Sequence, residues 1–553
     1  MTTHPDTAGP QDGPGDEAAD GPGGARGVSG TAVRVEVRSG AYRDSVALMR
    51  ISSAVSELDG VDTALVAMAT ELNLGLLTGM GAAAPSGTGP DDLLIAVRAA
   101  DEEAADTAVR AADAALTASG AAAGGGAGGS AGGHPPPRTV RTAAARATAD
   151  GTPATVALVS VPGRHAAAEA FDALDAGLDV MVFSDNVPVE HEVALKEAAD
   201  RLGRLVMGPD CGTAAIGGAG LGFTNAVRPG PVGVVAASGT GAQQLMCLLD
   251  AAGVGISHCL GVGGRDLSAR VGGRSTRTAL RMLDADPATE RIVLVSKPAD
   301  PAVAASVRRD CAALATPVHT VLLGAEGTDL TSAAVELVEA LGHPPPEWRR
   351  WAPATAPTRH TPGGAAASEA TESGAATGTG ALRGLFCGGT LADEAMAIAA
   401  RRLGPIRSNI PLVPDDPAWV LPPGGRSTGH TVIDFGDDSY TAGRPHPMID
   451  PTVRDAHLAE ALADPGTGAV LLDIVLGHGA HPDPAAGVAA VLADARRAVP
   501  VVVTLCGTVA DPQDIEAQAA RLTAAGAEVH LSNATATRHA LALLTPSSQE
   551  IST

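Results

Sequence analysis

The feature that most constrains the fold is a regular alternation of short apolar segments with helical ones. "ATVALVSVPG" (154–163), "VGVVAASG" (232–239) and "RIVLVSKP" (291–298) are nearly continuous apolar runs, and segments of helical periodicity separate them. The pattern returns in "LRGLFCGGT" (382–390) and "AVLLDIVLG" (469–477). Strands that are apolar throughout are buried on both faces, as in parallel sheets covered by helices. The sequence therefore predicts an α/β fold with several doubly wound parallel-sheet domains.

At 553 residues the chain is too long for one hydrophobic core, and its composition indicates where it divides. Three stretches rich in Gly, Ala, Pro and small polar residues cannot bury enough apolar surface to offset the entropy lost on folding. We expect a disordered tail (1–30), a small N-terminal α/β module (31–118), a low-complexity linker (119–150), two successive α/β domains (151–230 and 231–345), a disordered linker (346–380) and a C-terminal α/β domain (381–545).

The net charge and the cysteine pattern exclude several classes of function. A formal charge of −24 disfavours nucleic acids and anionic membrane surfaces as partners, but it does not exclude an anion held in a pocket. The sequence has no apolar run of about 20 residues, so no membrane span is expected. The six cysteines are scattered without CxxC spacing, and the N-terminal segment lacks an apolar signal sequence. We expect a cytoplasmic protein without a disulfide framework or a zinc site.

One glycine-rich turn suggests an anion site. In "GVVAASGTGAQQL" (233–245) an apolar strand ends in Ser-Gly-Thr-Gly, and a helical segment follows. A helix N-terminus offers free backbone N–H groups and a partial positive charge to an anion. An ordinary strand-to-helix turn is an equally good interpretation, because the segment has neither the lysine of a Walker loop nor the G-x-G-x-x-G pattern. The candidate ligand-binding residues are Ser238, Gly239, Thr240 and Gly241.

Two further turns follow apolar strands in the same block. "MGPDCGTAAI" (207–216) groups a carboxylate, a thiol and a hydroxyl, and "GVGGRDL" (261–267) adds an arginine that could clamp a phosphate or a carboxylate. Cys211 is a candidate nucleophile, but a buried structural cysteine is the favoured interpretation because no histidine base can be assigned to it. The candidate ligand-binding residues of these turns are Asp210, Cys211, Gly212, Thr213, Gly263, Gly264, Arg265 and Asp266.

The C-terminal block carries two polar segments after its strands. "DFGDDSYTAGRPHPMIDP" (434–451) combines carboxylates with Arg444 and His446, which suits a Mg²⁺ or phosphate site, with a solvated loop as the alternative. "GHGAHPDPAAG" (477–487) places His478 in a Gly-His-Gly turn, where a phosphoryl acceptor or proton-transfer group competes with an ordinary polar turn. We predict catalytic roles for His478, His446 and Arg444.

The order of these motifs resembles a known family. Residues 154–330 are similar to the α subunit of succinyl-CoA synthetase, with "GPDCGT", "PGPVGVVAASGT" and "GVGGRDL" at that family's strand-end turns. Residues 382–545 resemble the ligase domain of its β subunit, with "FCGGT" and "IDFGDD" at the glycine turns. Over about residues 32–545 the arrangement resembles the FdrA family of acyl-CoA-synthetase-like proteins. By this resemblance the further candidate ligand-binding residues are Gly388, Gly389, Thr390, Gly436, Asp437 and Asp438.

The resemblance implies a Rossmann-like CoA-binding half followed by two flavodoxin-like ligase domains. It implies an acyl-CoA synthetase-like subunit that handles CoA or an acyl phosphate, with CoA and Mg²⁺ as candidate cofactors and other subunits of a hetero-oligomeric complex as partners. It also implies that the turn at residues 238–241 faces a phosphoryl or acyl-phosphate group, opposed by the glycine turns of the C-terminal domain.

Departures from succinyl-CoA synthetase keep two other functions open. "VLLGAEGTDLTS" (321–332) has no histidine where that family carries its phosphohistidine, and "RSGAYRDSVA" (38–47) stands in place of the T-G-x-x-G turn of the CoA-binding domain. The chain also lacks an ATP-grasp domain. The resemblance to the FdrA family also implies a role in purine and allantoin nitrogen catabolism, where a complex transfers carbamoyl between phosphate and oxamate. A subunit of that kind needs neither the histidine nor ATP. A non-catalytic scaffold subunit is the third hypothesis.

Overall fold

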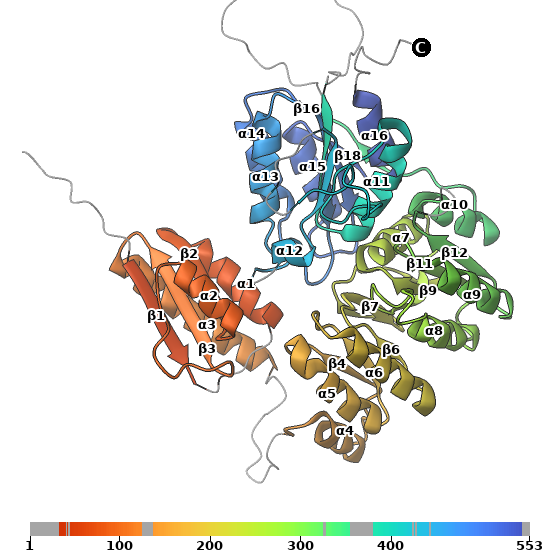
Figure 1. Cartoon of the computed structure of the whole chain (residues 1–553), viewed down its shortest axis with the longest axis horizontal. Coiled ribbons are helices and arrows are strands. Elements are labelled where there is room, and N and C mark those ends of the chain that lie inside the picture. Colours follow the sequence, from red (N-terminus) through yellow and green to blue (C-terminus); the bar gives the residue numbers. More distant parts are fainter. Residues whose placement is uncertain are drawn as a thin grey trace, which may run out of the picture.

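The described part of the chain forms four β-sheets with helices packed against them (Figure 1). The computed structural model describes residues 32–39, 41, 45–123, 137–324, 328–353, 380–422, 425, 429–441 and 444–544. The expected disordered tail (1–30) and the larger part of the expected linker at 346–380 lie outside these residues. None of the helices in the described ranges is both long and apolar enough to cross a bilayer.

The N-terminal module has a core of its own. Its three strands pair antiparallel in the order β1-β3-β2, and α1 and α3 pack against the sheet through buried residues such as Leu48, Ile95 and Ala108. The module is therefore an α/β unit of a different kind from the parallel-sheet domains. Its elements are β1 (Ala32–Arg38), α1 (Ser45–Ser56), β2 (Val61–Met68), α2 (Glu71–Gly79), β3 (Leu93–Ala99) and α3 (Glu102–Ala123).

The segment expected as a low-complexity linker (119–150) is helical at both ends. Helix α3 continues to Ala123, and α4 (Val140–Ala149) packs on α5 of the next sheet. The side chain of Thr139 accepts from the backbone N–H of Thr142, and the Thr142 hydroxyl accepts from the N–H of Thr139, so α4 begins with a capping box. The expectation of a linker is thus wrong for residues 140–149, where composition concealed a capped helix.

The second unit is a three-stranded parallel sheet in the order β4-β5-β6. Apolar strands and helices with an apolar stripe form its core, as the sequence predicts. The elements are β4 (Val156–Val159), α5 (Gly163–Asp175), β5 (Asp179–Val182), α6 (Val189–Leu202) and β6 (Val206–Met207).

The third unit is a six-stranded sheet in the order β12-β11-β9-β10-β7-β8. The first four strands are parallel, and a β7–β8 hairpin extends the edge antiparallel to β10, with Ala215 opposite Cys259. Although residues 213–222 fall in the expected 151–230 domain, their strands pair with the sheet that follows. The elements are β7 (Thr213–Ile216), β8 (Ala219–Gly222), β9 (Pro229–Ala237), α7 (Gly239–Ala251), β10 (Ile256–Gly261), α8 (Arg274–Asp284), β11 (Arg291–Ser296), α9 (Pro301–Ala312), β12 (Val318–Leu322) and α10 (Leu330–Ala340).

The C-terminal unit is a second six-stranded sheet, in the order β13-β18-β17-β16-β14-β15. All its strands are parallel except the short edge strand β13, which runs antiparallel to β18. The elements are β13 (Arg350–Trp351), β14 (Ala381–Phe386), α11 (Gly389–Leu403), β15 (Thr431–Asp434), α12 (Asp438–Thr441), α13 (Thr452–Ala463), β16 (Thr467–Val475), α14 (Ala485–Asp494), β17 (Val501–Cys506), α15 (Ile515–Ala524), β18 (Glu528–His530) and α16 (Asn533–Leu543).

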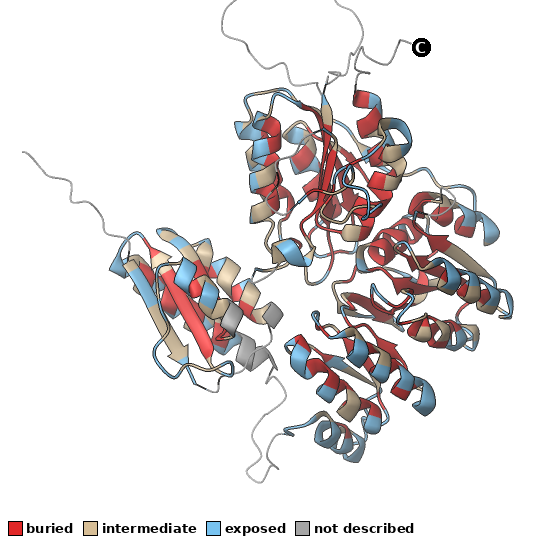
Figure 2. Cartoon of the chain, in the orientation of Figure 1, coloured by how far each residue is buried: buried red, intermediate tan, exposed pale blue. Residues whose placement is uncertain are grey.

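The two six-stranded sheets share one hydrophobic core. A single cluster of buried side chains runs from β9 and α7 of one sheet to β14, α11 and β16 of the other. Helix α7 lies between them, and most of its residues are buried, which Figure 2 shows as red ribbon. The buried side chain of Gln244 donates to the carbonyl of Leu531, 3.0 Å away, across the interface. The α/β, parallel-sheet fold class is confirmed for the chain from β4 onward.

Candidate functional site

The N-termini of α7 and α11 meet at the interface between the two six-stranded sheets. The Ser238 hydroxyl lies 2.7 Å from that of Thr390, and it also accepts from the N–H of Gly241 at 3.0 Å. A Cβ atom added to Gly388 would lie 2.6 Å from Oγ1 of Thr240, so the two turns are in direct contact. Each helix N-terminus carries a partial positive charge. The structure thus brings the predicted turns 238–241 and 388–390 into direct contact, with the N-termini of α7 and α11 side by side.

A buried carboxylate positions the turn that starts α11. Asp473 of β16 accepts from the backbone N–H of Cys387 at 2.6 Å and of Gly388 at 3.0 Å. Burial raises the pKa of Asp473 to about 7, while these N–H groups and the nearby Arg454 oppose the shift. Arg454 in turn donates to the carbonyl of Asp473 at 2.9 Å. The sequence analysis missed Asp473, although a lone aspartate inside the apolar run "AVLLDIVLG" is an unusual signal.

Lys297, also missed by the sequence analysis, lies beside the junction of the two helices. A Cβ atom on Gly389 would lie 2.9 Å from Nζ of Lys297 and 2.5 Å from Oδ2 of Asp434. Among the residues placed by the structure, no carboxylate lies within 4.0 Å of this ammonium group. Burial raises the pKa of Asp434 to about 6 and that of Asp393 to about 7, and the charge of Lys297 opposes both shifts. The ammonium group of Lys297, which has no ion-pair partner among the described residues, therefore lies near Asp393 and Asp434, two carboxyl groups that are partly protonated near neutral pH.

The turns of the other sheets close a further side of the site. Asp210, after β6, is accessible to solvent, yet the surrounding protein raises its pKa to about 6, with Lys297 opposing the shift and Asp185 adding to it. Burial also raises the pKa of Asp438, with Asp185 adding to the shift and Arg265 opposing it. These mutual effects show that the turns after β5, β6, β10 and β15 are neighbours. Ligands of parallel sheets collect at such carboxyl ends of strands.

Arg265 makes contacts within the protein that occupy part of its guanidinium group. Its Nη2 donates to the carbonyl of Val187 at 2.8 Å and pairs with Oε2 of Glu192 at 3.0 Å. About half of the side chain remains exposed. Arg265 can therefore contribute positive charge to the site, but a direct clamp on a ligand would require it to leave these partners.

His446 lies at the site as a neutral hydrogen-bond donor. Burial lowers the pKa of its imidazole to about 4, and Nδ1 accepts from the N–H of Met448 at 3.2 Å. The proton is therefore assigned to Nε2, which lies 2.8 Å from the position of a Cβ atom on Gly436. The ring of Phe223 lies 5.7 Å from that of His446, and Phe183 lies 5.8 Å beyond Phe223. The three rings therefore form a row of aromatic neighbours beside Gly436.

The other two predicted catalytic residues lie elsewhere. His478 is exposed, and its backbone N–H donates to the carbonyl of Thr224 at 2.8 Å. It lines an open cavity of about 350 Å³, together with Asn225 and Asp250. Arg444 is exposed, and the described residues offer its side chain no hydrogen bond or ion pair. Of the three, the structure places only His446 beside Gly436 and Asp434.

Two predicted ligand-binding residues have structural contacts instead. Asp266 is fully buried; it accepts from Nζ of Lys196 at 2.8 Å and from the backbone N–H of Thr276, in the first turn of α8, at 2.9 Å. Cys211 is also buried, its Sγ points at the carbonyl of Gly261 at 3.3 Å, and burial raises its pKa to about 12. Neither side chain can reach a ligand. For Cys211 the structural interpretation is the right one, because a thiolate is disfavoured there.

The remaining predicted positions support the turns. The Gly212 carbonyl accepts from the N–H of Phe223 at 2.7 Å, and Oδ1 of Asp437 accepts from the N–H and the hydroxyl of Ser439. A Cβ atom on Gly263, whose φ is +87°, would lie 2.6 Å from the Pro209 carbonyl, whereas Gly264 has open space around it. Thr213 is buried, with its hydroxyl 3.6 Å from a Cβ position on Gly239.

The carboxylates of residues 434–451 do not form a metal site by themselves. Within the described ranges, a group of three metal-ligating side chains with ligand atoms inside 4.8 Å occurs at Glu528, His530 and His539, not in this segment. Residues Asp434, Asp437 and Asp438 instead cap turns or face Lys297 and Asp185. A Mg²⁺ ion would need oxygens from a ligand to complete its coordination here.

Comparisons with known proteins agree with this architecture. A family model described as CoA-ligase matches residues 385–543, and one described as AllF, heavy metal-associated domain, matches residues 31–132. The uncharacterized protein YahF of Escherichia coli is 37% identical over 509 residues, covering 89% of this chain and 95% of YahF. The α subunit of succinate–CoA ligase from Methanothermobacter thermautotrophicus is 29% identical over 143 residues, which is 25% of this chain and 47% of that subunit.

A solved structure of ATP citrate lyase from Methanothrix soehngenii, in complex with citrate and coenzyme A, is 20% identical and covers 34% of this chain and 31% of that one. Its TM-score of 0.29 is too low to support an argument. The likeness to YahF, in contrast, spans nearly the whole of both chains. The chain therefore belongs to the same family as YahF, with a CoA-ligase domain at its C-terminal end.

Proposed function

We propose that this chain is a subunit of FdrA type that binds an acyl phosphate at the junction of α7 and α11 and supports transfer of the acyl group. The CoA-ligase domain and the α-subunit relatives support an acyl-CoA synthetase-like function in general. The observation that carries the more specific proposal is the 2.7 Å contact between the hydroxyls of Ser238 and Thr390, which fixes two helix N-termini from two sheets against each other.

Transfer of an acyl group from an acyl phosphate requires stabilisation of the negative charge that develops on the phosphate. A nucleophile attacks the acyl carbonyl carbon, the bond from that carbon to the bridging oxygen breaks, and the electron pair leaves with inorganic phosphate. Negative charge therefore grows on the phosphate during transfer, where the two helix N-termini and Lys297 stabilise it. The Nε2–H of His446 is a second donor at this site. These groups are in place before the reaction, so they stabilise the charge without reorganising.

Carbamoyl phosphate is the acyl phosphate that this site favours. Its NH₂ group is a hydrogen-bond donor, and the carboxyl groups of Asp210, Asp393 and Asp434 gather around Lys297 as acceptors. An alkyl acyl phosphate offers these carboxyl groups no hydrogen-bond donor. We propose that oxamate, through its amide nitrogen, is the nucleophile that accepts the carbamoyl group. Further subunits of the complex would supply the rest of the binding site for oxamate.

CoA is the alternative acceptor, and the residues of the first parallel sheet do not favour it. A Cβ atom on Gly163, the first residue of α5, would lie 2.2 Å from the carbonyl of Asp185. The backbone of Asp185 and Asn186 therefore covers the N-terminus of α5, which is where a pyrophosphate would bind in a sheet of this type.

Replacement of Lys297 by methionine tests the proposal. Calorimetric titration of the wild-type chain with carbamoyl phosphate, acetyl phosphate and CoA is expected to show binding of carbamoyl phosphate in preference to the other two. Lys297→Met should weaken that binding on the order of 10- to 100-fold, because it removes one charge-assisted interaction worth about 1.5–3 kcal/mol. Arg281→Met, which removes an exposed cation paired with Asp200, is the matched control and should bind like the wild type.

Three outcomes decide between the hypotheses. Preferential binding of CoA would favour the synthetase alternative, and equal binding by the wild type and Lys297→Met would contradict the site. Binding of none of the three ligands would contradict an anion site formed by this chain alone.

The affinity for anions should fall as the pH rises. The pKa values of Asp210 and Asp434 are raised to about 6 and that of Asp393 to about 7, so all three are largely neutral at about pH 5 and charged at about pH 8. Each deprotonation adds a negative charge facing the bound anion, and the dissociation constant should rise by at least roughly tenfold over this range. Titration with sulfate, whose own charge does not change over the range, checks this; pH-independent binding would contradict it.

A further inference from the structure

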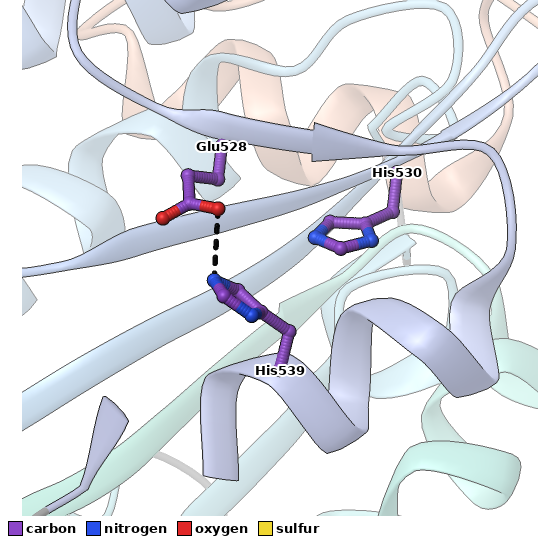
Figure 3. A group of neighbouring side chains, drawn as sticks. All are labelled: Glu528, His530 and His539. Carbon is purple, nitrogen blue, oxygen red and sulfur yellow. Dashed lines mark ion pairs between the residues drawn. The ribbon is translucent and has the colours of Figure 1, made fainter. Parts of the chain in front are cut away.

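A second cluster of metal-binding side chain types lies away from the junction of α7 and α11. Glu528 and His530 are on the same face of β18, two residues apart, and His539 projects from α16 toward them (Figure 3). One ligand atom from each side chain lies within 4.8 Å of the other two. The sequence analysis did not find this group, because its three members come from two elements and have no zinc-finger spacing.

His530 is buried and His539 is partly buried, and the Nε2 atom of each is buried and unsatisfied within the part of the chain that the structure describes. Among the described residues, Nε2 of His530 and Nε2 of His539 have no hydrogen-bond partner, although a buried polar atom left this way is costly. His530 is 5% exposed, so its unsatisfied nitrogen lies in the protein interior. An imidazole nitrogen placed in this way can bind a metal.

The ion pair within the cluster does not account for these atoms. Nε2 of His539 lies 2.8 Å from Oε2 of Glu528, but the approach lacks hydrogen-bond geometry. The same carboxylate contacts Arg350 of β13. Nδ1 of His530 faces the hydroxyl of Thr535 at 3.5 Å. Nε2 of His530 has no partner within the described ranges, and the centroid of its ring lies 5.1 Å from that of the His539 ring.

We propose that Glu528, His530 and His539 bind one Zn²⁺ ion that ties α16 to the edge of the C-terminal sheet. Two imidazole nitrogens and a carboxylate oxygen are a ligand set typical of zinc, and water would complete four-coordination. Bonds of about 2.0–2.1 Å to each ligand require only a small closing movement of the three side chains. The Thr535 hydroxyl would orient His530 from behind, as ligating histidines are usually held by a second partner.

The position of the cluster suggests a structural role. Helix α16 begins directly after β18, and the side chain of its first residue, Asn533, donates to Oε2 of Glu394 in α11 at 2.7 Å. Ser532 bonds to Thr331 of α10 at 2.7 Å. A metal that fixes α16 against β18 therefore also fixes the contact between the two six-stranded sheets. The inference does not depend on the proposed function.

Zinc binding to the full-length chain tests the site. The chain is stripped of metal with a chelator and then titrated with Zn²⁺ against a chromophoric competitor, and thermal unfolding is followed with Zn²⁺ and with EDTA. We expect one ion per chain and a higher unfolding midpoint with Zn²⁺. His539→Gln should weaken zinc binding by at least about tenfold and abolish the shift in midpoint.

Two further variants keep the result interpretable. His319→Gln removes a histidine that also pairs with a glutamate, Glu336 at 3.1 Å, but lies outside the cluster, and it should bind zinc like the wild type. Glu528→Gln tests the carboxylate if His539→Gln does not fold in EDTA. Equal affinity of the wild type and both cluster variants, or no binding by the folded wild type, would overturn the proposal.

Discussion

Lys196→Met is expected to destabilise the chain by about 3–5 kcal/mol. The ammonium group of Lys196 lies 2.8 Å from both Glu192 and Asp266, and all three side chains are almost completely buried. Methionine has a similar volume but no charge, so two carboxylates would remain buried with Arg265 as the cation still in contact with one of them. The free energy of unfolding, measured with urea and followed by circular dichroism, checks this value.

An exposed ion pair provides the control for this experiment. Arg270 contacts Glu190, and both side chains are more than half exposed. Arg270→Met should change the free energy of unfolding by no more than about 1 kcal/mol, because solvent screens such pairs. Similar losses from the two variants would show that burial of the Lys196 network contributes little to stability.

Gly388→Ala is expected to abolish most anion binding while the chain still folds. The new Cβ atom would lie 2.6–2.8 Å from three atoms of Thr240, which is too close for a contact, so the N-termini of α7 and α11 must separate. The hydrogen bond between Ser238 and Thr390 would then lengthen, and the two helix ends would no longer face one anion. Affinity for carbamoyl phosphate should fall by at least about tenfold, because an anion then loses its interaction with one helix N-terminus, which is worth up to about 2 kcal/mol in a partly buried site.

Gly75→Ala is the matched control. A Cβ atom on Gly75, an exposed residue of α2, meets nothing within 4 Å. Alanine favours a helix by up to about 1 kcal/mol over glycine, so this variant should be no less stable and should bind like the wild type. Unchanged affinity in Gly388→Ala would show that the contact between the helix ends does not determine anion binding.

The parallel-sheet architecture could be predicted from the sequence because periodicity is a local property. The apolar strands and the turns after them stand where the pattern places them, including the turns at Ser238 and Gly388. The hairpin β7–β8 was harder to assign. Its Gly217–Gly218 turn, with both φ values positive, is typical of a two-residue hairpin. Its membership of the following sheet depends on Ala215 pairing with Cys259, which is 44 positions away and leaves no local trace.

The site was predicted less completely than the fold, for a similar reason. His446 and His478 both follow strands of the C-terminal sheet. The direction of each side chain depends on tertiary packing, which the periodicity of the sequence does not reveal. Lys297 and Asp473 are single charged residues at the end of, or inside, apolar strands. Both side chains lie at the N-terminus of α11, which comes from another part of the sequence, so the local pattern gives no sign of this contact.

The common core of the two six-stranded sheets has a consequence for ligand binding. Where a site forms between mobile domains, part of the interaction with the ligand is used to bring the domains together, and the observed affinity is lower by that amount. Here α7 is packed between both sheets, so the distance between the two helix ends is set when the chain folds. The entropy of aligning the two helix ends is therefore lost during folding, so an anion bound there, as proposed, would meet a pre-organised site.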